Sequence, residues 1–201
     1  MKVRECFELL APHASEAVVI SALGMAANEW WAVTRSDETF YMHGAMGFAS
    51  SFALGVALTM PNPRTPVWTL NGDGSMCMNL GSLLTEASRQ PDNLKHFVVA
   101  NRCYQTVGGL PMAGRADTDY AAIARGAGVR DAITIRSLDE MRQALPRILA
   151  PGYLFTVLEV DCEAVPVIPP PQPFEGAEMK YRFGRHMERR FGVTVFGSQG
   201  Y

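Results

Sequence analysis

The chain has 201 residues, of which 48% are hydrophobic and 19% are charged, and its formal net charge is −2. This length suits one domain with a substantial core, and the composition excludes a globally disordered chain. Nucleic-acid binding is not expected either, because it would need a clustered basic face.

The four cysteines, Cys6, Cys77, Cys103 and Cys162, are scattered and form no CxxC pair. This spacing argues against a zinc or iron–sulfur site, and we expect reduced thiols in a cytoplasmic protein. The N-terminus carries charges and a proline where a signal peptide needs an unbroken apolar segment. The longest apolar stretch, residues 45–60, is shorter than the roughly 20 residues that span a bilayer, so we expect a buried helix there and no contact with a membrane.

Apolar runs alternate with helical patterns through the first part of the chain. In chain order they predict a helix at Val3–Leu10, a strand at Ala17–Ser21, a helix at Asn28–Thr34, a strand at Thr39–Met42 and a helix at Phe48–Met60. Asn28 is a suitable N-cap for its helix. The segment Pro61-Asn62-Pro63 ends the last of these helices.

The second part continues the alternation. It predicts a strand at Pro66–Leu70, a helix at Asn79–Arg89, a strand at Lys95–Ala100, a Gly-rich loop at 102–116, a helix at Asp119–Gly126, a strand at Ala132–Ile135, a helix at Ser137–Leu149 and a strand at Tyr153–Val160. Ser137 and Glu140 have the spacing of a capping box. The strand candidates are continuous apolar runs, which is typical of strands that are buried on both faces.

Strands that alternate with helices predict right-handed β-α-β crossovers. We therefore expect an α/β fold, with a doubly wound, mostly parallel sheet and helices on both faces, formed by residues 1–162. Residues 163–201 are predicted to be a C-terminal extension, in which the proline-rich residues 165–173 are extended and Tyr181–Phe191 is a short basic amphipathic helix. This extension could wrap a neighbouring subunit or cover the edge of its own sheet.

A polar segment, Gly72-Asp73-Gly74-Ser75, lies between an apolar strand and a helix. In an open parallel sheet, ligands bind at the carboxyl ends of the strands. The glycines allow close approach of a ligand, and the N–H groups at the start of a helix favour phosphate. Asp73 would repel a phosphate unless a cation lay between them, so the pattern indicates Mg²⁺ shared by the carboxylate and a phosphate.

Further hard ligands follow the next strand. Asn101 lies 28 residues after Asp73, and its amide oxygen can reach the same ion if the two strands are neighbours. The backbone carbonyl of Cys103 could complete the metal site, whereas its thiol need not take part, because sulfur is a poor ligand for Mg²⁺. The alternative is a simple turn with Asp73 as a helix cap, which leaves the position of Asn101 unexplained.

This pattern resembles the diphosphate-binding motif of thiamine diphosphate-dependent enzymes, in which Gly-Asp-Gly is followed by a helix, a strand and an Asn. The family often has a doubled Asn and then a Tyr; here Ala100 replaces the first Asn, whereas Asn101 and Tyr104 match. The resemblance covers roughly residues 3–161 and implies that residues 1–162 are a thiamine diphosphate-binding domain of the PP type. Its implied cofactor-binding residues in this motif are Gly72, Asp73, Gly74, Ser75, Asn101, Cys103, Tyr104 and Gln105.

A second stretch, Tyr41–Leu58, is similar to a G-x-M-G turn and small-residue helix of the same family. The resemblance places the backbone of Gly44 and Met46 against the cofactor. In the preceding loop, the carbonyl of Gly24 would accept a hydrogen bond from the aminopyrimidine, and Met25 would support the bent cofactor. Both methionines could equally be core residues.

Enzymes of this family also need a glutamate against the pyrimidine ring, which a separate pyrimidine-binding domain supplies. A chain of 201 residues has room for one such domain. Its own Glu16, Glu29 and Glu86 are interpreted as surface or helix-face residues. The resemblance therefore implies a hetero-oligomer with a pyrimidine-binding α-subunit that supplies the activating glutamate.

His43 is the candidate catalytic residue, because it precedes the Gly44 turn at the end of a strand. It could bind the diphosphate, reach the substrate, or make only a local hydrogen bond. The other histidines are expected to be at the surface or structural. Arg102 and Arg115 flank the Gly-rich loop and could bind an anionic substrate group, although loop arginines are more often solvated.

Within the family, the two motifs are most similar to the β-subunits of sulfopyruvate decarboxylases and to phosphonopyruvate decarboxylase. The resemblance implies a lyase subunit that depends on Mg²⁺ and thiamine diphosphate and decarboxylates a small 2-oxo acid without oxidation. Three alternatives stay open: a 2-oxoacid:ferredoxin oxidoreductase β-subunit, against which the scattered cysteines count, a carboligating synthase subunit, and a non-catalytic cofactor-binding subunit.

Overall fold

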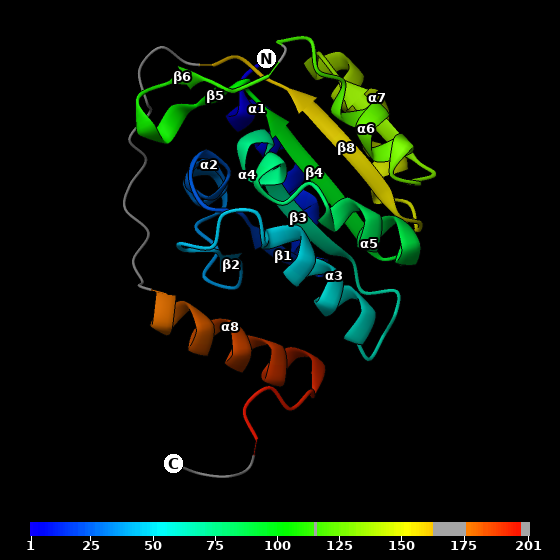
Figure 1. Ribbon diagram of the computed structural model, residues 1–201. Helices are drawn as coiled ribbons and strands as arrows, with labels where there is room; N and C mark the ends of the chain where they lie inside the picture. The colour runs from blue at the N-terminus through cyan, green and yellow to red at the C-terminus, as the bar shows by residue number, and fades with distance from the viewer. Residues whose placement is uncertain (115, 163–175, 198–201) are drawn as a thin grey trace.

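The computed structural model describes residues 1–114, 116–162 and 176–197. Its main element is a six-stranded sheet in the order β2-β1-β3-β4-β8-β7 (Figure 1). In that order the strands are β2 (Phe40–Tyr41), β1 (Val18–Ser21), β3 (Val67–Gly72), β4 (Leu94–Ala100), β8 (Leu154–Glu159) and β7 (Ala132–Ile135). All five pairings are parallel, which confirms the predicted α/β fold with a mostly parallel sheet.

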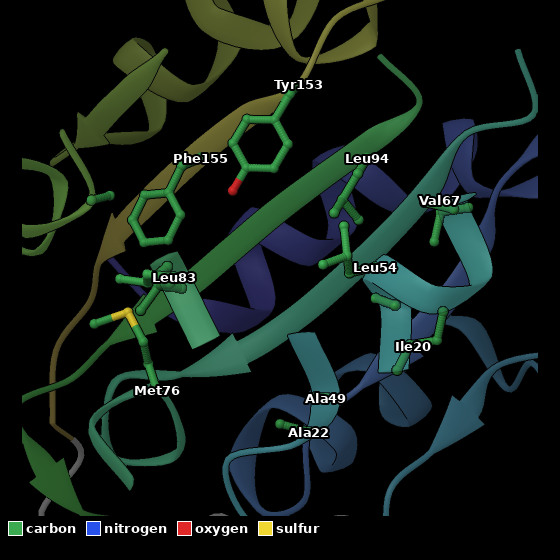
Figure 2. Packing of buried hydrophobic residues seen from close by; sticks show 14 of the residues in the cluster. Ile20, Ala22, Ala49, Leu54, Val67, Met76, Leu83, Leu94, Tyr153 and Phe155 are labelled. Atoms are coloured by element: carbon green, nitrogen blue, oxygen red, sulfur yellow. The ribbon is translucent and has the colours of Figure 1, made fainter. Parts of the chain in front are cut away.

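Helices cover both faces of this sheet. One face carries α3 (Ala49–Thr59), α4 (Asp73–Met78), α5 (Ser82–Arg89) and α6 (Tyr120–Gly126), and the other carries α1 (Val3–Leu10), α2 (Met25–Thr34) and α7 (Leu138–Leu149). Neighbouring residues of a strand face opposite cores, so Phe155 lies in the first core with Leu83 (Figure 2) and Leu154 in the second. Burial on both faces explains the continuous apolar runs of these strands.

The C-terminal helix α8 (Gly176–Phe191) is longer than the helix predicted at 181–191, and it packs on the edge strand β2. The ring of Phe183 lies 5.2 Å from that of Phe40 in β2 and 6.1 Å from that of Phe52 in α3, measured between ring centres. This helix therefore covers an edge of its own sheet. The proline-rich residues 165–173 lie outside the described residues, and the domain boundary after residue 162 stays a prediction.

The helix predicted at Asn79–Arg89 is interrupted near its start in the structure. Helix α4 begins directly after β3, and α5 follows a break at residues 79–81. At this break the backbone of Asn79 leaves the helical conformation, with φ −140° and ψ 51°, and its side-chain amide donates to the carbonyl of Gly47 at 3.1 Å. The side chain thus connects the α4–α5 break to the turn before α3.

The predicted helix caps are confirmed in part. Gly24, with φ +86°, is the N-cap of α2, so Asn28 lies inside that helix and its prediction as the cap is wrong. Ser137 caps α7 as predicted, its Oγ accepting from the N–H of Glu140 at 3.1 Å. The Glu140 carboxylate accepts from the N–H of Arg136 at 2.7 Å, so the second half of the capping box is shifted by one residue.

The loop predicted at 102–116 contains a short antiparallel hairpin. Its strands are β5 (Cys103–Tyr104) and β6 (Leu110–Pro111), and the 3-10 helix η2 (Gln105–Val107) lies between them. A second 3-10 helix, η1 (Ala11–Glu16), follows α1. Among the described residues, no helix is long and apolar enough to cross a bilayer; the apolar helix α3 has 11 residues.

Cys103 and Cys162 form a disulfide, so the prediction of four reduced thiols is wrong for this pair. The strand register explains their proximity: Ala100 of β4 pairs with Glu159 of β8, and each cysteine lies three residues beyond its member of that pair. The chain therefore leaves both strands side by side, which brings the two Cα atoms to 6.3 Å, a distance that disulfides span. The other two cysteines are free.

Candidate functional site

The carboxyl ends of β3 and β4 bring together the two side chains that were predicted to hold a metal. The strands are neighbours, and Gly72 of β3 pairs with Val99 of β4. Asp73 and Asn101 follow directly, and their side chains are buried. The structure therefore places Asp73 and Asn101 at the same edge of the sheet, as a shared ligand would require.

Asp73 is a buried carboxylate held by backbone donors. Its Oδ1 accepts from the N–H of Gly74 and its Oδ2 from the N–H of Arg102, each at 2.8 Å. Burial raises the pKa of Asp73 from 3.8 to about 6, although the hydrogen bonds from Arg102 and Gly74 lower it. The ionised carboxylate is therefore costly in this environment, and a nearby cation would stabilise it.

Asn101 is oriented by the loop that follows it. Its Nδ2 donates to Oε1 of Gln105 at 3.1 Å, and its Oδ1 accepts from the N–H of Cys103 at 3.2 Å. The same Nδ2 lies 3.9 Å from Sδ of Met25. Gln105 and Met25, both predicted to bind the cofactor, thus adjoin the predicted metal ligand.

The oxygen atoms at this edge fit a hard divalent cation. They are the Asp73 carboxylate, the Asn101 amide oxygen and the backbone carbonyl of Cys103, which are the kinds of ligand that Mg²⁺ accepts. Among the described residues, no group of three or more His, Cys, Asp or Glu side chains could hold a metal. A metal site in this part of the chain therefore needs amide or carbonyl oxygens in addition to a carboxylate.

We expect cation binding at Asp73 to weaken in mild acid. A cation at this position would need the ionised carboxylate, whereas a pKa of about 6 leaves Asp73 largely protonated below that pH. The apparent Mg²⁺ affinity should fall about tenfold per pH unit below about 6, and calorimetric titrations between about pH 5 and 8 would measure it. An affinity that stays constant over this range would contradict the assignment.

Asp73 has the opposite effect on the stability of the fold itself. Because folding raises its pKa, Asp73 contributes stability fully below pH 3.8, and this contribution is lost as the pH rises through about 6. The fold therefore carries an unfavourable charge at neutral pH, which a bound cation would offset.

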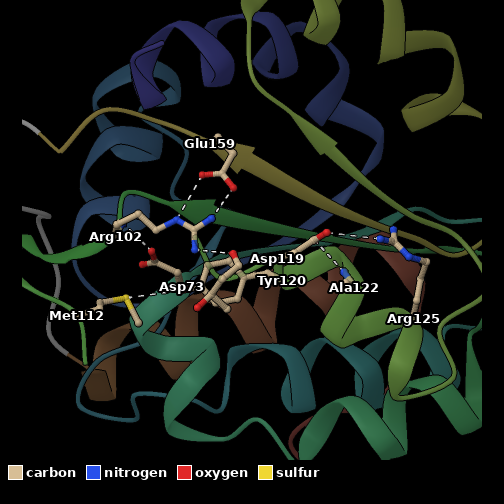
Figure 3. Close-up of polar contacts among 9 residues, drawn as sticks. Asp73, Arg102, Met112, Asp119, Tyr120, Ala122, Arg125 and Glu159 are labelled. Carbon is tan, nitrogen blue, oxygen red and sulfur yellow. Dashed lines mark hydrogen bonds and ion pairs between the residues drawn. The ribbon is translucent and has the colours of Figure 1, made fainter. Parts of the chain in front are cut away.

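Arg102 stabilises the loop between β4 and α6 through contacts with three other residues (Figure 3). Its Nη2 lies 2.5 Å from Oε1 of Glu159, its Nη1 donates to the carbonyl of Thr118 at 2.7 Å, and its guanidinium lies 4.5 Å from the centre of the Tyr120 ring. The Arg102 backbone is left-handed, with φ 60°. These contacts occupy the guanidinium within the chain, so Arg102 is not a fully solvated loop arginine, and its contact with an anionic substrate group stays a prediction.

The turn that ends at Gly47 is fastened to α4. Its N–H donates to Oγ of Ser75 at 3.0 Å, and its carbonyl accepts from Nδ2 of Asn79 at 3.1 Å. Gly47 has φ +91°, and a Cβ at this position would lie only 3.0 Å from Cβ of Asn79, so glycine is required. This attachment holds the turn that contains Gly44 and Met46 against the start of α4.

Two other glycines of the site are in close contact with the hairpin loop. A Cβ on Gly74 would lie 2.8 Å from the ring of Tyr104 and 3.4 Å from Cε of Met46. A Cβ on Gly24 would lie 3.3 Å from Cγ2 of Thr106. The three stretches that were predicted to bind the cofactor, although far apart in the sequence, therefore converge at one edge of the sheet.

His43 precedes the turn that contains Gly44 and adjoins the start of α8. It is exposed, and its Cβ lies 3.9 Å from the position of a Cβ on Gly176, at the start of α8. Its catalytic role stays a prediction. Arg115 lies outside the described residues, so its contact with an anionic group also stays a prediction.

A buried polar cluster of Glu86, His96 and Asn71 was not predicted from the sequence. Nδ1 of His96 lies 3.0 Å from Oε1 and 3.1 Å from Oε2 of Glu86, and Nε2 lies 3.3 Å from Nδ2 of Asn71. Glu86 is 1% exposed and His96 is fully buried, so of the two interpretations of Glu86 the surface position is wrong, whereas it does lie on a helix face, the buried face of α5. The available signal was His96 itself, because a histidine in a strand buried on both faces needs a polar partner.

The other two glutamates differ from each other. Glu16 is exposed, as predicted. Glu29 is 5% exposed and lies on a helix face of α2, so only the surface alternative is wrong for it as well; its carboxylate accepts from Nε of Arg4 at 2.7 Å. Arg4 lies on α1 and Glu29 on α2, so the Arg4 guanidinium pairs with the buried Glu29 carboxylate where the two helices meet.

Two named relatives cover most of the described domain. The chain is 39% identical over 142 residues to a phosphonopyruvate decarboxylase of Streptomyces viridochromogenes, and the match covers 71% of this chain and 35% of that protein. It is 38% identical over 138 residues to a sulfopyruvate decarboxylase subunit beta of Methanothermobacter thermautotrophicus, and this match covers 68% of this chain and 70% of that protein. The chain thus spans about a third of the phosphonopyruvate decarboxylase that it matches.

Solved structures share the fold. A benzoylformate decarboxylase from Polynucleobacter necessarius matches with a TM-score of 0.65 and 19% identity, over 83% of this chain and 34% of that chain. A 2-oxoglutarate:ferredoxin oxidoreductase from Magnetococcus marinus matches with a TM-score of 0.64 and 15% identity, over 95% and 75% of the two chains. At these identities the similarity concerns the fold alone.

The family described as "Thiamine pyrophosphate enzyme, C-terminal TPP binding domain" matches residues 20–160. This range includes every residue that was predicted to bind the cofactor, and it ends one residue after β8, the last strand of the sheet in chain order. The chain therefore belongs to the thiamine pyrophosphate enzyme family and contains its TPP-binding domain.

Proposed function

We propose that this chain is the diphosphate-binding subunit of an enzyme that uses thiamine diphosphate and Mg²⁺ to decarboxylate a 2-oxo acid without oxidation. The observation that carries the proposal is the meeting of Asp73, Asn101 and the Gly-Asp-Gly-Ser turn at one sheet edge. The relatives with 38–39% identity are named as decarboxylases of sulfopyruvate and phosphonopyruvate, which supports a substrate of this type. The oxidoreductase match, at 15% identity, supports only the fold.

In this proposal, Asp73, Asn101 and the carbonyl of Cys103 hold Mg²⁺, which links the chain to the diphosphate. When bound, the cofactor supplies the electron sink for loss of CO₂. The chain positions it: Gly72 leaves space at the end of β3, since no atom lies within 4 Å of a Cβ built there. The burial of Asp73 strengthens its attraction for the ion, because charges interact more strongly away from water.

We also propose that a pyrimidine-binding α-subunit completes the site in the cytoplasm and supplies the activating glutamate. Two comparisons support a partner. One relative is named as a subunit beta, and another is a longer chain of which this protein matches 35%. An apolar surface beside the cofactor site supports it independently.

This apolar surface is formed by the outer sides of α3, α4 and α5. Residues 44–63 and 74–85, which contain most of these helices, include no Asp, Glu, Lys or Arg. The large side chains that are 39–64% exposed on this surface are Phe48, Leu58, Met78, Leu80 and Leu84. The surface reaches the cofactor site, because a Cβ on Gly47 would lie 3.2 Å from Cβ of Met78. An uncharged apolar surface of this kind is typical of the core of a subunit interface.

We expect Leu84→Asp to weaken assembly with the α-subunit at least about 30-fold, because docking would bury an unpaired charge. The chain itself should fold, since Leu84 is 64% exposed. Leu149→Asp is the matched control: Leu149 is 40% exposed and lies on α7, on the other face of the sheet. Co-purification and analytical ultracentrifugation would compare the variants, and wild-type assembly of Leu84→Asp would exclude this surface.

The proposed function is tested by a CO₂-release assay on the chain co-purified with its α-subunit. We expect release from sulfopyruvate or phosphonopyruvate with a kcat/KM at least about tenfold above that for pyruvate. Release should require thiamine diphosphate, Mg²⁺ and both chains, and the second product should be an aldehyde. CO₂ that appears only with an electron acceptor would indicate an oxidoreductase instead, and a ligated product would indicate a synthase. No release of CO₂ from any of these acids would contradict the proposal.

A further inference from the structure

We propose that Cys103 and Cys162 are a reversible thiol–disulfide site, acted on by small thiols and disulfides such as glutathione, and that the disulfide strengthens cofactor binding at the adjacent metal edge. The part that concerns cofactor affinity rests on the proposed function. The pair is placed for this role, because Cys103 is two residues after Asn101 and Cys162 is three residues after the end of β8.

Cys103 belongs to the loop that orients the metal ligands. Its N–H donates to Oδ1 of Asn101 at 3.2 Å, and it pairs with Pro111 in the β5–β6 hairpin. Its own carbonyl is the third oxygen of the proposed ligand set. A restraint on the backbone of Cys103 therefore acts on two of the three proposed ligands.

Cys162 follows a segment that is fixed to the sheet. The N–H of Val160 donates to the carbonyl of Ala100 at 3.1 Å, which extends the pairing of β8 with β4. The N–H of Asp161 donates to the carbonyl of Met1 at 3.0 Å, and its carboxylate lies 3.2 Å from the N-terminal amine. The disulfide thus ties the metal-binding loop to a fixed point at the end of β8.

Cys162 is the accessible half of the disulfide. It is exposed, whereas Cys103 is 7% exposed. An external thiolate can therefore attack Sγ of Cys162, break the S–S bond and release Cys103 as a thiolate. A second external thiol then displaces Cys162 from the mixed disulfide. In total, two external thiols are oxidised to one external disulfide, and their two electrons and two protons reduce Cys103 and Cys162 to thiols. Oxidised glutathione drives the same exchange in the reverse direction.

Reduction should loosen the loop without unfolding it, because other contacts remain. Arg102 still binds Glu159 and Tyr120, and the N–H of Met112 still donates to the carbonyl of Arg102 at 3.1 Å. Cofactor binding would then have to order the backbone around Cys103, at a cost in entropy. We therefore expect the reduced chain to bind thiamine diphosphate about tenfold more weakly in the presence of Mg²⁺.

The test uses the full chain with its α-subunit in buffers of oxidised or reduced glutathione. Thiol alkylation with peptide mass spectrometry measures the oxidised fraction of the pair, calorimetry measures cofactor affinity, and amide hydrogen exchange measures protection of residues 103–112. On reduction, the wild type should lose affinity and protection. Cys162→Ser should behave like the reduced wild type in both buffers, whereas Cys77→Ser, at an exposed free thiol, should keep the redox difference.

Equal alkylation of Cys103 and Cys162 in both buffers would overturn the proposal. So would a Cys162→Ser variant that binds and exchanges like the oxidised wild type, and Cys162→Ala provides a second variant if the first fails to fold. If the wild type bound no thiamine diphosphate in either buffer, the proposed function would fail instead. In that case, redox-dependent protection of residues 103–112 would still support the thiol–disulfide site, and redox-independent protection would overturn it.

Discussion

Asp73→Ala is expected to weaken Mg²⁺-dependent binding of thiamine diphosphate at least about 100-fold, because it removes the only carboxylate of the proposed ligand set. The chain should remain folded. The two hydrogen bonds of Asp73 are made to backbone N–H groups, and burial makes its negative charge unfavourable without a cation. Calorimetry with and without Mg²⁺ measures the affinity, and circular dichroism measures the fold.

Two further variants sharpen this experiment. Asp73→Asn keeps the shape of the side chain but removes its charge, and it should lose binding to a similar extent. Asp92→Ala is the control, because Asp92 is an exposed aspartate that precedes β4, at the opposite end of that strand from Asn101. Wild-type affinity in Asp73→Ala would rule out Asp73 as a metal ligand.

Removing one member of the buried Glu86–His96 pair is expected to lower the free energy of unfolding by about 3–5 kcal/mol. Neither side chain is more than 1% exposed, so Glu86→Leu or His96→Leu alone leaves an unpaired polar group in the core. The double variant should recover at least about half of the loss, because it leaves neither group behind. Urea unfolding of the three variants measures these free energies.

An exposed ion pair provides the control for this cycle. Arg142 lies 2.7 Å from Asp139 on α7, and both side chains are more than half exposed. Arg142→Ala should change the free energy of unfolding far less, since exposed pairs contribute little. Single variants of Glu86 and His96 that cost no more than this control, or a double variant that is simply additive, would show that the pair does not act as a unit.

The main features of the site could be predicted because they depend on local patterns. Strands buried on both faces are continuous apolar runs, so the predicted strand at 95–100 differs from β4 by one residue. The carboxyl ends of adjacent parallel strands meet at one edge, so the positions of Asp73 and Asn101 could be inferred from where their strands end. The glycines at positions 24, 47 and 74 likewise marked points where the backbone packs closely against neighbouring segments.

Other features depend on contacts between segments far apart in the chain, which local patterns do not specify. Arg102 and Glu159 are 57 residues apart, so the sequence around Arg102 could not show that its guanidinium is already paired. The Cys103–Cys162 contact, with a separation of 59 residues, follows only once β8 is known to lie beside β4. Glu86 has the appearance of a surface residue until α5 is packed over His96.

The most direct test of the metal edge is a crystal structure of the assembled enzyme with thiamine diphosphate and with Mn²⁺ in place of Mg²⁺. Manganese is located by its anomalous scattering. We expect one peak beside the diphosphate, within about 2 Å of a carboxylate oxygen of Asp73, the amide oxygen of Asn101 and the carbonyl oxygen of Cys103. A peak elsewhere, or a diphosphate bound away from Asp73 and Asn101, would contradict the assignment on which the proposed function depends.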